Sequence, residues 1–131
     1  MNIVVDTSII IAVIANEPEK GALIKLTKGA DLIAPQSVHW EIGNAFSSML
    51  KQKRITLEQA LNAIKIYRKI PVQFVGAKLE ESLELAGTLG IYAYDAYLIE
   101  CALRYNLPLL SLDRNLIRAA RQKNVKVLEV V

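Results

Sequence analysis

Short apolar runs and longer stretches of helical spacing alternate along the chain. Runs rich in β-branched or aliphatic residues predict strands over residues 3–5, 32–34, 72–75, 109–112 and 125–131. Apolar residues at three- and four-residue steps, or continuous apolar stretches between turn residues, predict helices over residues 9–14, 18–28, 36–53, 56–70, 79–87, 94–105 and 115–122. No linker, repeat or low-complexity segment interrupts this alternation.

The ends of several predicted helices carry local signals. Thr56 followed by Gln59 forms a capping box at the start of one helix. Pro18 suits the first turn of another, which Gly29 ends. Strands that alternate with helices are typical of a parallel sheet covered by helices on both faces. We therefore expect one α/β domain over residues 1–131, with a three-layer α/β/α architecture around a central parallel sheet.

Length and composition limit the class of protein. The 131 residues suit a single domain, and 53% hydrophobic with 22% charged residues indicates a globular chain, not a disordered one. The apolar run over residues 9–15 is far shorter than the roughly 20 residues of a membrane span, and Met1 and Asn2 offer no positively charged start for a secretory signal. The single cysteine, Cys101, excludes an intrachain disulfide and a thiolate metal cage. We expect a soluble, cytoplasmic protein.

Three aspartates lie at the junctions between predicted elements. Asp6 directly follows the first strand and Asp113 follows residues 109–112, so both belong at the carboxyl edge of the sheet, where open parallel sheets bind ligands. Asp95 starts a predicted buried helix, and we expect it at the same edge. Because Asp is also a favoured helix N-cap, capping alone accounts equally well for each of the three taken singly.

Glu41 is a carboxylate inside a predicted helix, one step from the apolar stripe through Val38 and Ala45. Asn44 and Ser48 follow it on the same flank of that helix. Taken singly, Glu41 is interpreted more simply as a boundary residue whose carboxylate reaches solvent. Its functional interpretation depends on its combination with the three aspartates.

A metal site follows if the four carboxylates meet. Like charges that lie together cannot all stay ionised unless cations neutralise them. Mg2+ and Mn2+ are hard ions that favour carboxylate and water oxygens. One or two such ions can activate water and stabilise the leaving oxygen of an in-line phosphodiester displacement. This chemistry needs no nucleophilic Cys or Ser–His pair, and none is visible.

The net charge of +3 alone says little about partners. Once four acids are assigned to a site, 16 basic residues stand against nine of the 13 acidic ones elsewhere. The basic residues cluster at 51–54, at 65–69, and at Arg114, Arg118 and Arg121. A basic surround with an acidic, metal-neutralised centre suits a polyanionic substrate. We expect Arg114 and Arg118 to contact phosphate, and most lysines to be ordinary solvated helix residues.

Four short motifs occur in order along the chain. They are Asp6-Thr7-Ser8, Glu41-Ile42-Gly43-Asn44, Tyr94-Asp95-Ala96 and Ser111-Leu112-Asp113. On an α/β pattern, this series resembles the motifs of the PIN-domain family, and in particular those of the small prokaryotic VapC-type toxin ribonucleases. Any one motif is weak, but the four in order are specific, and the resemblance covers essentially the whole chain.

The resemblance implies a site, an activity and partners. The implied metal ligands and catalytic residues are Asp6, Glu41, Asp95 and Asp113. The positions that would support them by hydrogen bonding are Ser8, Asn44 and Ser111, the last a serine where the family usually has threonine. The implied activity is Mg2+- or Mn2+-dependent hydrolysis of RNA to a 5′-phosphate and a 3′-hydroxyl. The implied partners are a second copy in a homodimer and a small cognate antitoxin of a type II toxin–antitoxin pair.

Two alternatives keep the same fold. One is a non-catalytic PIN-like module that binds RNA or a protein, and the other is a housekeeping RNA-processing nuclease that uses the same four acids. Other phosphate-handling classes fit poorly, because no P-loop or dinucleotide-binding glycine motif is present. Ser8 stands where a phosphatase resembling the haloacid dehalogenases has a second Asp, and Val4 and Val5 stand where a receiver domain has an acidic pair.

The remaining chemistry-bearing side chains are expected to be structural. We interpret His39 as a structural histidine and Cys101 as a small buried hydrophobe. Trp40 and Phe46 are expected to pack in the core or at a dimer surface, not to stack on bases. The tyrosines near Asp95 are expected mainly to pack, although one could line a groove; they are Tyr92, Tyr94 and Tyr97.

Overall fold

The computed structural model describes residues 1–130 and contains a four-stranded, all-parallel sheet in the order β3-β2-β1-β4. The strands are β1 (Asn2–Val5), β2 (Asp31–Pro35), β3 (Val72–Val75) and β4 (Leu109–Leu110). Val4 of β1 lies opposite Ile33 of β2 on one side and Leu109 of β4 on the other. Residues 3–5 of β1 are completely buried, as expected for a central parallel strand whose two faces are both covered.

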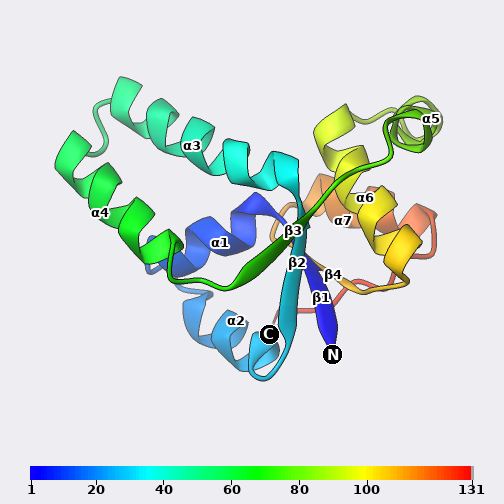
Figure 1. Ribbon diagram of the computed structural model, residues 1–131, viewed down its shortest axis with the longest axis horizontal. Helices are drawn as coiled ribbons and strands as arrows, with labels where there is room; N and C mark the ends of the chain where they lie inside the picture. Colours follow the sequence, from blue (N-terminus) through cyan, green and yellow to red (C-terminus); the bar gives the residue numbers. More distant parts are fainter. Residues whose placement is uncertain (131) are drawn as a thin grey trace.

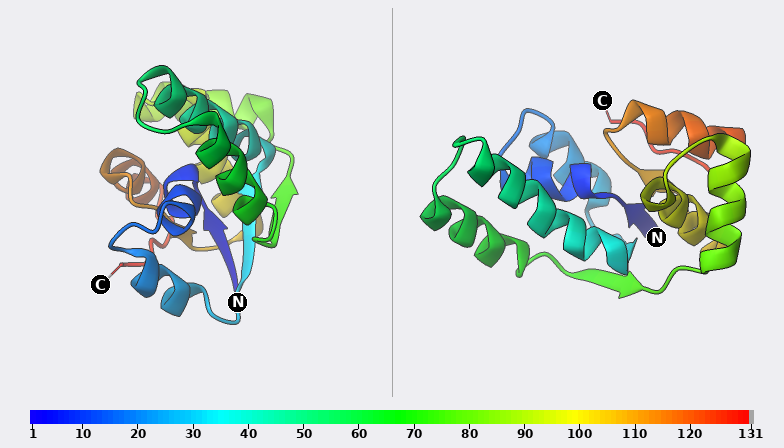
Figure 2. Two further views of the ribbon diagram at one scale, coloured as in Figure 1. Left: turned by 90° about the vertical axis from the view of Figure 1, so that its left-hand side faces the viewer. Right: turned by 90° about the horizontal axis from the view of Figure 1, so that it is seen from above.

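Seven helices surround the sheet in the described part of the chain. They are α1 (Thr7–Ile14), α2 (Lys20–Thr27), α3 (Gln36–Lys51), α4 (Leu57–Tyr67), α5 (Leu79–Leu89), α6 (Ala93–Tyr105) and α7 (Arg114–Gln122). Figure 1 shows α1, α3 and α4 on one side of the sheet and α5, α6 and α7 on the other, and the two views of Figure 2 agree. The predicted three-layer α/β/α architecture is confirmed. None of these helices is long and apolar enough to cross a membrane.

Local signals in the sequence mark several helix ends correctly. At the start of α4, the Thr56 hydroxyl accepts a bond from Gln59 N at 3.1 Å, and the Gln59 side chain accepts one from Thr56 N at 2.9 Å. The predicted capping box is therefore confirmed. Gly29, two residues beyond α2, has φ 76°, a left-handed conformation that glycine adopts without steric cost.

Several predicted elements differ at their ends; the strand expected over 109–112 covers only Leu109–Leu110, and two further elements differ for clear reasons. The helix expected over 56–70 stops at Tyr67, because Pro71 disfavours helical geometry at the residue before it. The last strand expected over 125–131 is wrong for the described residues, where only one isolated parallel bridge joins Leu109 to Val127. Both hydrogen bonds of this contact involve the backbone of Leu109. Because β4 is only two residues long, the pairing does not extend into a strand. Val131 lies outside the described residues.

Three predicted structural side chains are placed as expected. Phe46 and Cys101 are both buried in the hydrophobic core, and burial raises the pKa of the Cys101 thiol to about 11. His39 Nδ1 lies 2.7 Å from the hydroxyl of Tyr67, a hydrogen bond between α3 and α4. These contacts confirm the structural interpretation of the three residues.

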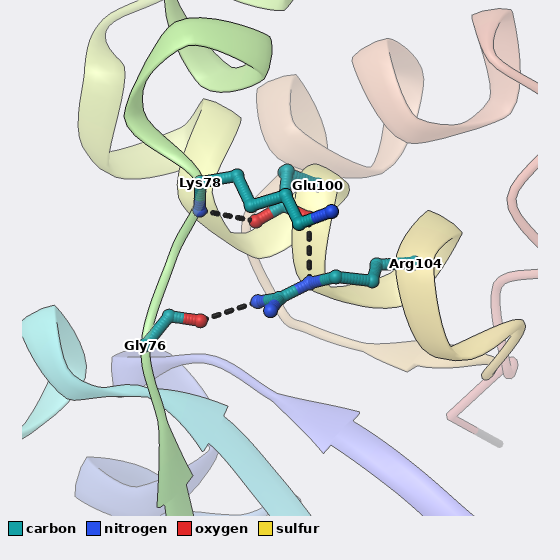
Figure 3. Close-up of polar contacts among 4 residues, drawn as sticks. All are labelled: Gly76, Lys78, Glu100 and Arg104. Carbon is teal, nitrogen blue, oxygen red and sulfur yellow. Dashed lines mark hydrogen bonds and ion pairs between the residues drawn. The ribbon is translucent and has the colours of Figure 1, made fainter.

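An ion pair within α6, between the buried Glu100 and the partly exposed Arg104, bonds to the segment between β3 and α5 (Figure 3). Glu100, only 4% exposed, accepts a bond from Lys78 N at 2.7 Å and pairs with Arg104 Nε at 2.9 Å. The Arg104 guanidinium also donates to the carbonyl oxygen of Gly76. Both charges of this pair are thus used to hold one loop of the fold.

Candidate active site

Asp6 stands at the carboxyl end of the central strand. It follows β1, caps α1 by accepting a bond from Ile9 N at 3.3 Å, and is only 5% exposed. Its Oδ1 accepts a bond from Ser8 Oγ at 2.6 Å, and its Oδ2 accepts one from Ser111 Oγ at 2.5 Å. Since a carboxylate has about four acceptor positions, Asp6 keeps capacity for a further ligand.

The two serines also connect separate turns of the chain. Ser8 Oγ accepts a bond from Leu112 N at 3.0 Å, and Ser111 Oγ accepts one from Asp113 N at 2.9 Å. The turn after β1 and the turn after β4 are therefore held together around Asp6. Ser8 and Ser111 lie where a supporting role requires them to be.

Glu41 lies in α3 and contacts the turn that carries Asp6. Its Oε2 accepts a bond of 2.5 Å from the hydroxyl of Thr7. The residue is half-buried, as a boundary position predicts, and its carboxylate also bonds to the turn that follows β1. The bond from Thr7 was not predicted; the available signal was the place of Thr7 directly after Asp6, in the turn at the sheet edge.

Asp95 and Asp113 differ in what they do for their helices. Asp113 caps α7, accepting bonds from Asn115 N at 2.9 Å and Leu116 N at 3.3 Å. Asp95 lies in the first turn of α6, whose N-cap is Tyr92, so capping does not explain it. The capping interpretation is therefore confirmed for Asp6 and Asp113 and wrong for Asp95.

The four acids affect one another electrostatically. Burial raises the pKa of Asp6 above 3.8, hydrogen bonds from Ser111 and Ser8 oppose the rise, and the charge of Asp113 adds to it. Burial and the charges of Asp6 and Asp95 raise the pKa of Glu41 against the bond from Thr7. Burial and the charges of Asp113 and Asp6 likewise raise the pKa of Asp95. The fold thus concentrates negative charge at one end of the sheet.

The four carboxylates are the kind of ligand that a hard divalent cation prefers, but they are not arranged as a ready binding site. No Lys or Arg among residues 1–130 forms an ion pair with any of the four acids. Over the same residues, no three Asp, Glu, His or Cys side chains converge into a ready metal-ligand cluster. Oxygen ligands whose charges repel one another are the donor set that Mg2+ or Mn2+ neutralises.

A cavity of about 990 Å³ opens beside Glu41 and Asp95. Asn44 lines it one helical turn from Glu41, but within residues 1–130 its side chain forms no hydrogen bond to the acids. Trp40, Tyr92 and Tyr94 line this cavity and are exposed, so none of the three packs in the core of this chain. Packing of Trp40 at a dimer surface stays a prediction. Tyr97 is partly buried.

A second cavity, of about 1040 Å³, lies on the Ser111 side of Asp6. Arg114, Arg118 and Arg121 of α7 all line it. Arg121 also pairs with Glu129 at 3.7 Å, whereas Arg114 and Arg118 form no ion pair within residues 1–130. The two arginines expected to contact phosphate therefore share a cavity with Ser111, whereas the acids that line it are Glu19 and Glu129.

The chain is thus a parallel α/β domain with an acidic cluster at the carboxyl edge of its sheet, and it matches the model of the PIN domain over residues 3–122. It belongs to the PIN-domain family, as the four sequence motifs predicted. A search of curated proteins gives no significant match.

Solved structures show the same fold at low sequence identity. PAE2754 from Pyrobaculum aerophilum is 24% identical, with a TM-score of 0.71 over 91% of this chain and 87% of that one. VapBC2 from Rickettsia felis, bound to a DNA fragment from its promoter, is 16% identical, with a TM-score of 0.68 over 98% of both chains. VapC20 from Mycobacterium tuberculosis, a toxin that cleaves the sarcin–ricin loop, is 16% identical, with a TM-score of 0.62 over 89% and 94%.

Proposed function

We propose that this PIN-domain protein is a Mg2+- or Mn2+-dependent endoribonuclease and the toxin of a type II toxin–antitoxin pair. The observation that carries the proposal is the buried Asp6 carboxylate, electrostatically coupled to acids from three other parts of the chain and lacking a cationic partner within residues 1–130. Such a group costs stability unless it serves to bind a cation.

In the proposed site, each part of the chain has a distinct role. Asp6, Glu41, Asp95 and Asp113 would hold the ion. When bound, a divalent cation supplies an activated water and charge neutralisation for the phosphodiester. Ser8 and Ser111 fix the two oxygens of Asp6, and Thr7 fixes Oε2 of Glu41. Asn44, which lines the cavity beside Glu41, is proposed to support the site from there.

The proposed substrate is RNA. The solved toxin VapC20 is described as cleaving the sarcin–ricin loop, and its fold is that of this chain. Arg114 and Arg118 line the cavity beyond Ser111, where guanidinium groups can bind phosphate oxygens in pairs of parallel bonds. The acids then face the scissile bond from one side, while the arginines hold the backbone.

The proposed partners follow from the same family. VapBC2 was solved with DNA from its promoter, which supports an antitoxin partner for this chain. We also propose that the protein forms a homodimer. We propose a cytoplasmic location, because a toxin that cleaves cellular RNA acts there. Size measurement by light scattering tests the dimer directly, with a mass of twice 14.5 kDa expected.

The test of the activity is RNA cleavage by the purified protein with Mg2+ or Mn2+, beside an EDTA control and the Asp95→Asn variant. Asp31→Asn is the matched control, because Asp31 is exposed at the opposite, amino-terminal end of β2. We expect cutting that EDTA and Asp95→Asn abolish and Asp31→Asn preserves. Cleavage unaffected by EDTA or by Asp95→Asn contradicts the site, and metal binding without any cleavage favours a non-catalytic module.

Expression in cells separates a toxin from a housekeeping nuclease. Induced wild-type protein is expected to arrest growth, and the Asp95→Asn protein at the same level is not. An active nuclease that leaves growth unchanged contradicts the toxin assignment and favours an RNA-processing enzyme.

A further inference from the structure

We propose that the cavity lined by α7 is a second ligand site, which binds a nucleoside 5′-monophosphate through Arg114, Arg118 and Glu19. The inference goes beyond the proposed function, because it needs neither a metal ion nor cleavage of RNA. It gives the two arginines, which the proposed function assigns to the RNA backbone, a small ligand with the same phosphate chemistry. Phosphate, ribose and base each have a matching group in this cavity.

The cavity lined by α7 differs from the acidic cluster in the residues that form it. Its volume is about 1040 Å³, and its lining within residues 1–130 contains none of the four proposed metal ligands. The walls come from Glu19, the turn after β4, one side of α7 and residues 127–130. Small-molecule sites span about 300 to 1000 Å³, so a whole nucleotide has room here.

Three arginines of α7 line the cavity from one side of the helix. Arg114, Arg118 and Arg121 are four and three residues apart, the steps that place side chains on one helix face. Arg121 pairs with Glu129 at 3.7 Å, whereas Arg114 and Arg118 form no ion pair within residues 1–130. Two free guanidinium groups match a phosphate monoester, whose charge is about −1.5 to −2 at pH 7. Each can bind phosphate oxygens through paired parallel bonds.

Glu19 supplies a hydrogen-bond acceptor that the fold itself does not use. Its Oε2 is buried and has no hydrogen-bond partner within residues 1–130. Glu19 stands at the N-cap position of α2, but its side chain forms no capping bond. Because a buried carboxylate oxygen without a partner is costly, a ligand that brings a donor gains affinity there. Ribose hydroxyls are such donors, and acidic side chains bind them in dinucleotide-binding folds.

The rest of the lining offers apolar surface for a base. Residues 127–130 follow α7 and run back beside it, as Figure 2 shows. A nucleobase that covers aliphatic side chains removes their surface from water, which favours binding. Gln122 also lines the cavity, and its amide can donate to and accept from a base edge. The aliphatic residues of the lining, each only partly buried by the chain, are Leu112, Ile117, Val127, Leu128 and Val130.

The acids of the lining favour a single nucleotide over a strand. Glu19 and Glu129 share the cavity with the arginines. A phosphodiester chain that continues past the arginines brings further phosphates near these carboxylates, and like charges repel. A mononucleotide presents its one phosphate to the arginines and only uncharged hydroxyls to Glu19. The mixed charge of the cavity therefore suits the smaller ligand.

The test is calorimetric titration of the purified full chain with the 5′-monophosphates of adenosine, guanosine, cytidine and uridine. EDTA is present throughout, so that no divalent cation holds a phosphate at the acidic cluster. We expect at least one of the four to bind with a Kd of about 0.1 mM or lower. The matching nucleoside and inorganic phosphate are each expected to bind about 10-fold more weakly or less. Binding of none of the four, or equal binding of inorganic phosphate, overturns the inference.

Arginine variants assign the binding to the cavity. Arg118→Ala is expected to weaken nucleotide binding by about 10-fold or more, through the loss of a charge-assisted contact. Arg54→Ala is the matched control, because Arg54 is exposed and lies outside the lining of this cavity. It removes the same charge and is expected to leave the affinity unchanged. Equal weakening in both variants, or an unchanged affinity in Arg118→Ala, contradicts the site.

The role of Glu19 is tested through the ribose. The 2′,3′-dideoxy form of the bound nucleotide lacks both hydroxyl donors and is expected to bind the parent protein about 5-fold more weakly. In Glu19→Ala the two forms are expected to bind alike, and this comparison within one variant is insensitive to small changes in its stability. A dideoxy nucleotide that binds the parent protein as tightly as the ribonucleotide overturns the inference.

An oligouridine with a 5′-hydroxyl end distinguishes the nucleotide site from a path for RNA. If it binds the parent protein in EDTA more tightly than any monophosphate does, and Arg118→Ala removes that binding, the cavity belongs to an RNA strand and the inference is overturned. Nucleotide binding in a protein that cuts no RNA with Mg2+ or Mn2+ supports the inference and removes the proposed function. Cleavage without nucleotide binding does the reverse, so the two failures are distinguishable.

Discussion

Two buried carboxylates in this protein have opposite electrostatic surroundings. Glu100 is 4% exposed and Asp6 is 5% exposed, so both have lost most of their water. Glu100 pairs with Arg104 Nε at 2.9 Å and accepts a backbone bond from Lys78 (Figure 3). Asp6 accepts bonds from two serine hydroxyls and one backbone N–H, none of which carries a positive charge.

The difference separates a structural acid from a candidate functional one. A buried charge is costly unless it is paired, and Arg104 satisfies that requirement for Glu100 inside the fold. At Asp6 the chain supplies hydrogen bonds but also places further acids within electrostatic reach, and the pKa of Asp6 rises. Within residues 1–130 no Lys or Arg forms an ion pair with Asp6, so its carboxylate stays open to a proton or a cation.

The largest effect that distinguishes the two regions is on catalysis. Asp6→Asn is expected to lower metal-dependent RNA cleavage by at least about 100-fold, because the loss of a ligand removes several kcal/mol of transition-state stabilisation. Asn still caps a helix well, so the variant is expected to fold. Circular dichroism and cleavage rates check this. Glu100→Gln, the matched amide variant, is expected to cut RNA at close to the parent rate while folded.

The second effect is on stability, and here the larger change is expected at the Glu100–Arg104 pair. Arg104→Met leaves Glu100 buried without its partner and is expected to lower the free energy of unfolding by about 3 kcal/mol, as for other broken buried pairs. Urea unfolding measures the change. Asp95→Asn in the same experiment with EDTA is expected not to destabilise, since it removes a repelled carboxylate. Equal losses in both variants would show that the two regions are alike.

Metal binding provides the third difference. Free Mg2+ or Mn2+ at about 100 times its Kd stabilises a protein that binds it only when folded by about 2.7 kcal/mol. We expect thermal melting of the parent protein to rise with added metal and the Asp95→Asn protein to respond less. Arg104→Met, although less stable, is expected to keep the full response. A melting temperature that is indifferent to millimolar metal would count against the site.

The smallest effect is the pH dependence of the metal-free protein. Because the pKa values of Asp6, Glu41 and Asp95 are raised on folding, the folded state keeps protons that the unfolded chain releases above about 3.8 to 4.5. The contribution of these groups is therefore fully present below that range and is lost as pH rises through their raised folded values. Unfolding with EDTA across this window is expected to show a shallower slope for Asp95→Asn than for Asp31→Asn.

Much of the fold could be predicted from local signals, and its errors have local causes too. The strands, the capping box at Thr56 and the order of elements depend on residues a few positions apart, which the chain displays directly. The end of α4 at Tyr67, before Pro71, could also be predicted. The final strand could not, because pairing of residues 125–130 depends on the length of β4, which is only two residues.

By itself, the sequence determined the alternating elements, the family motifs and the placement of Asp6 and Asp113 at helix starts, since strand period, helix period and caps are all short-range. Only the tertiary structure brought Ser111 to Asp6 across 105 positions and Glu41 to Thr7 across 34. It also left Trp40 and Tyr92 exposed, although their residue types favour burial. Contact and exposure at these positions depend on how the helices dock on the sheet, which no local pattern encodes.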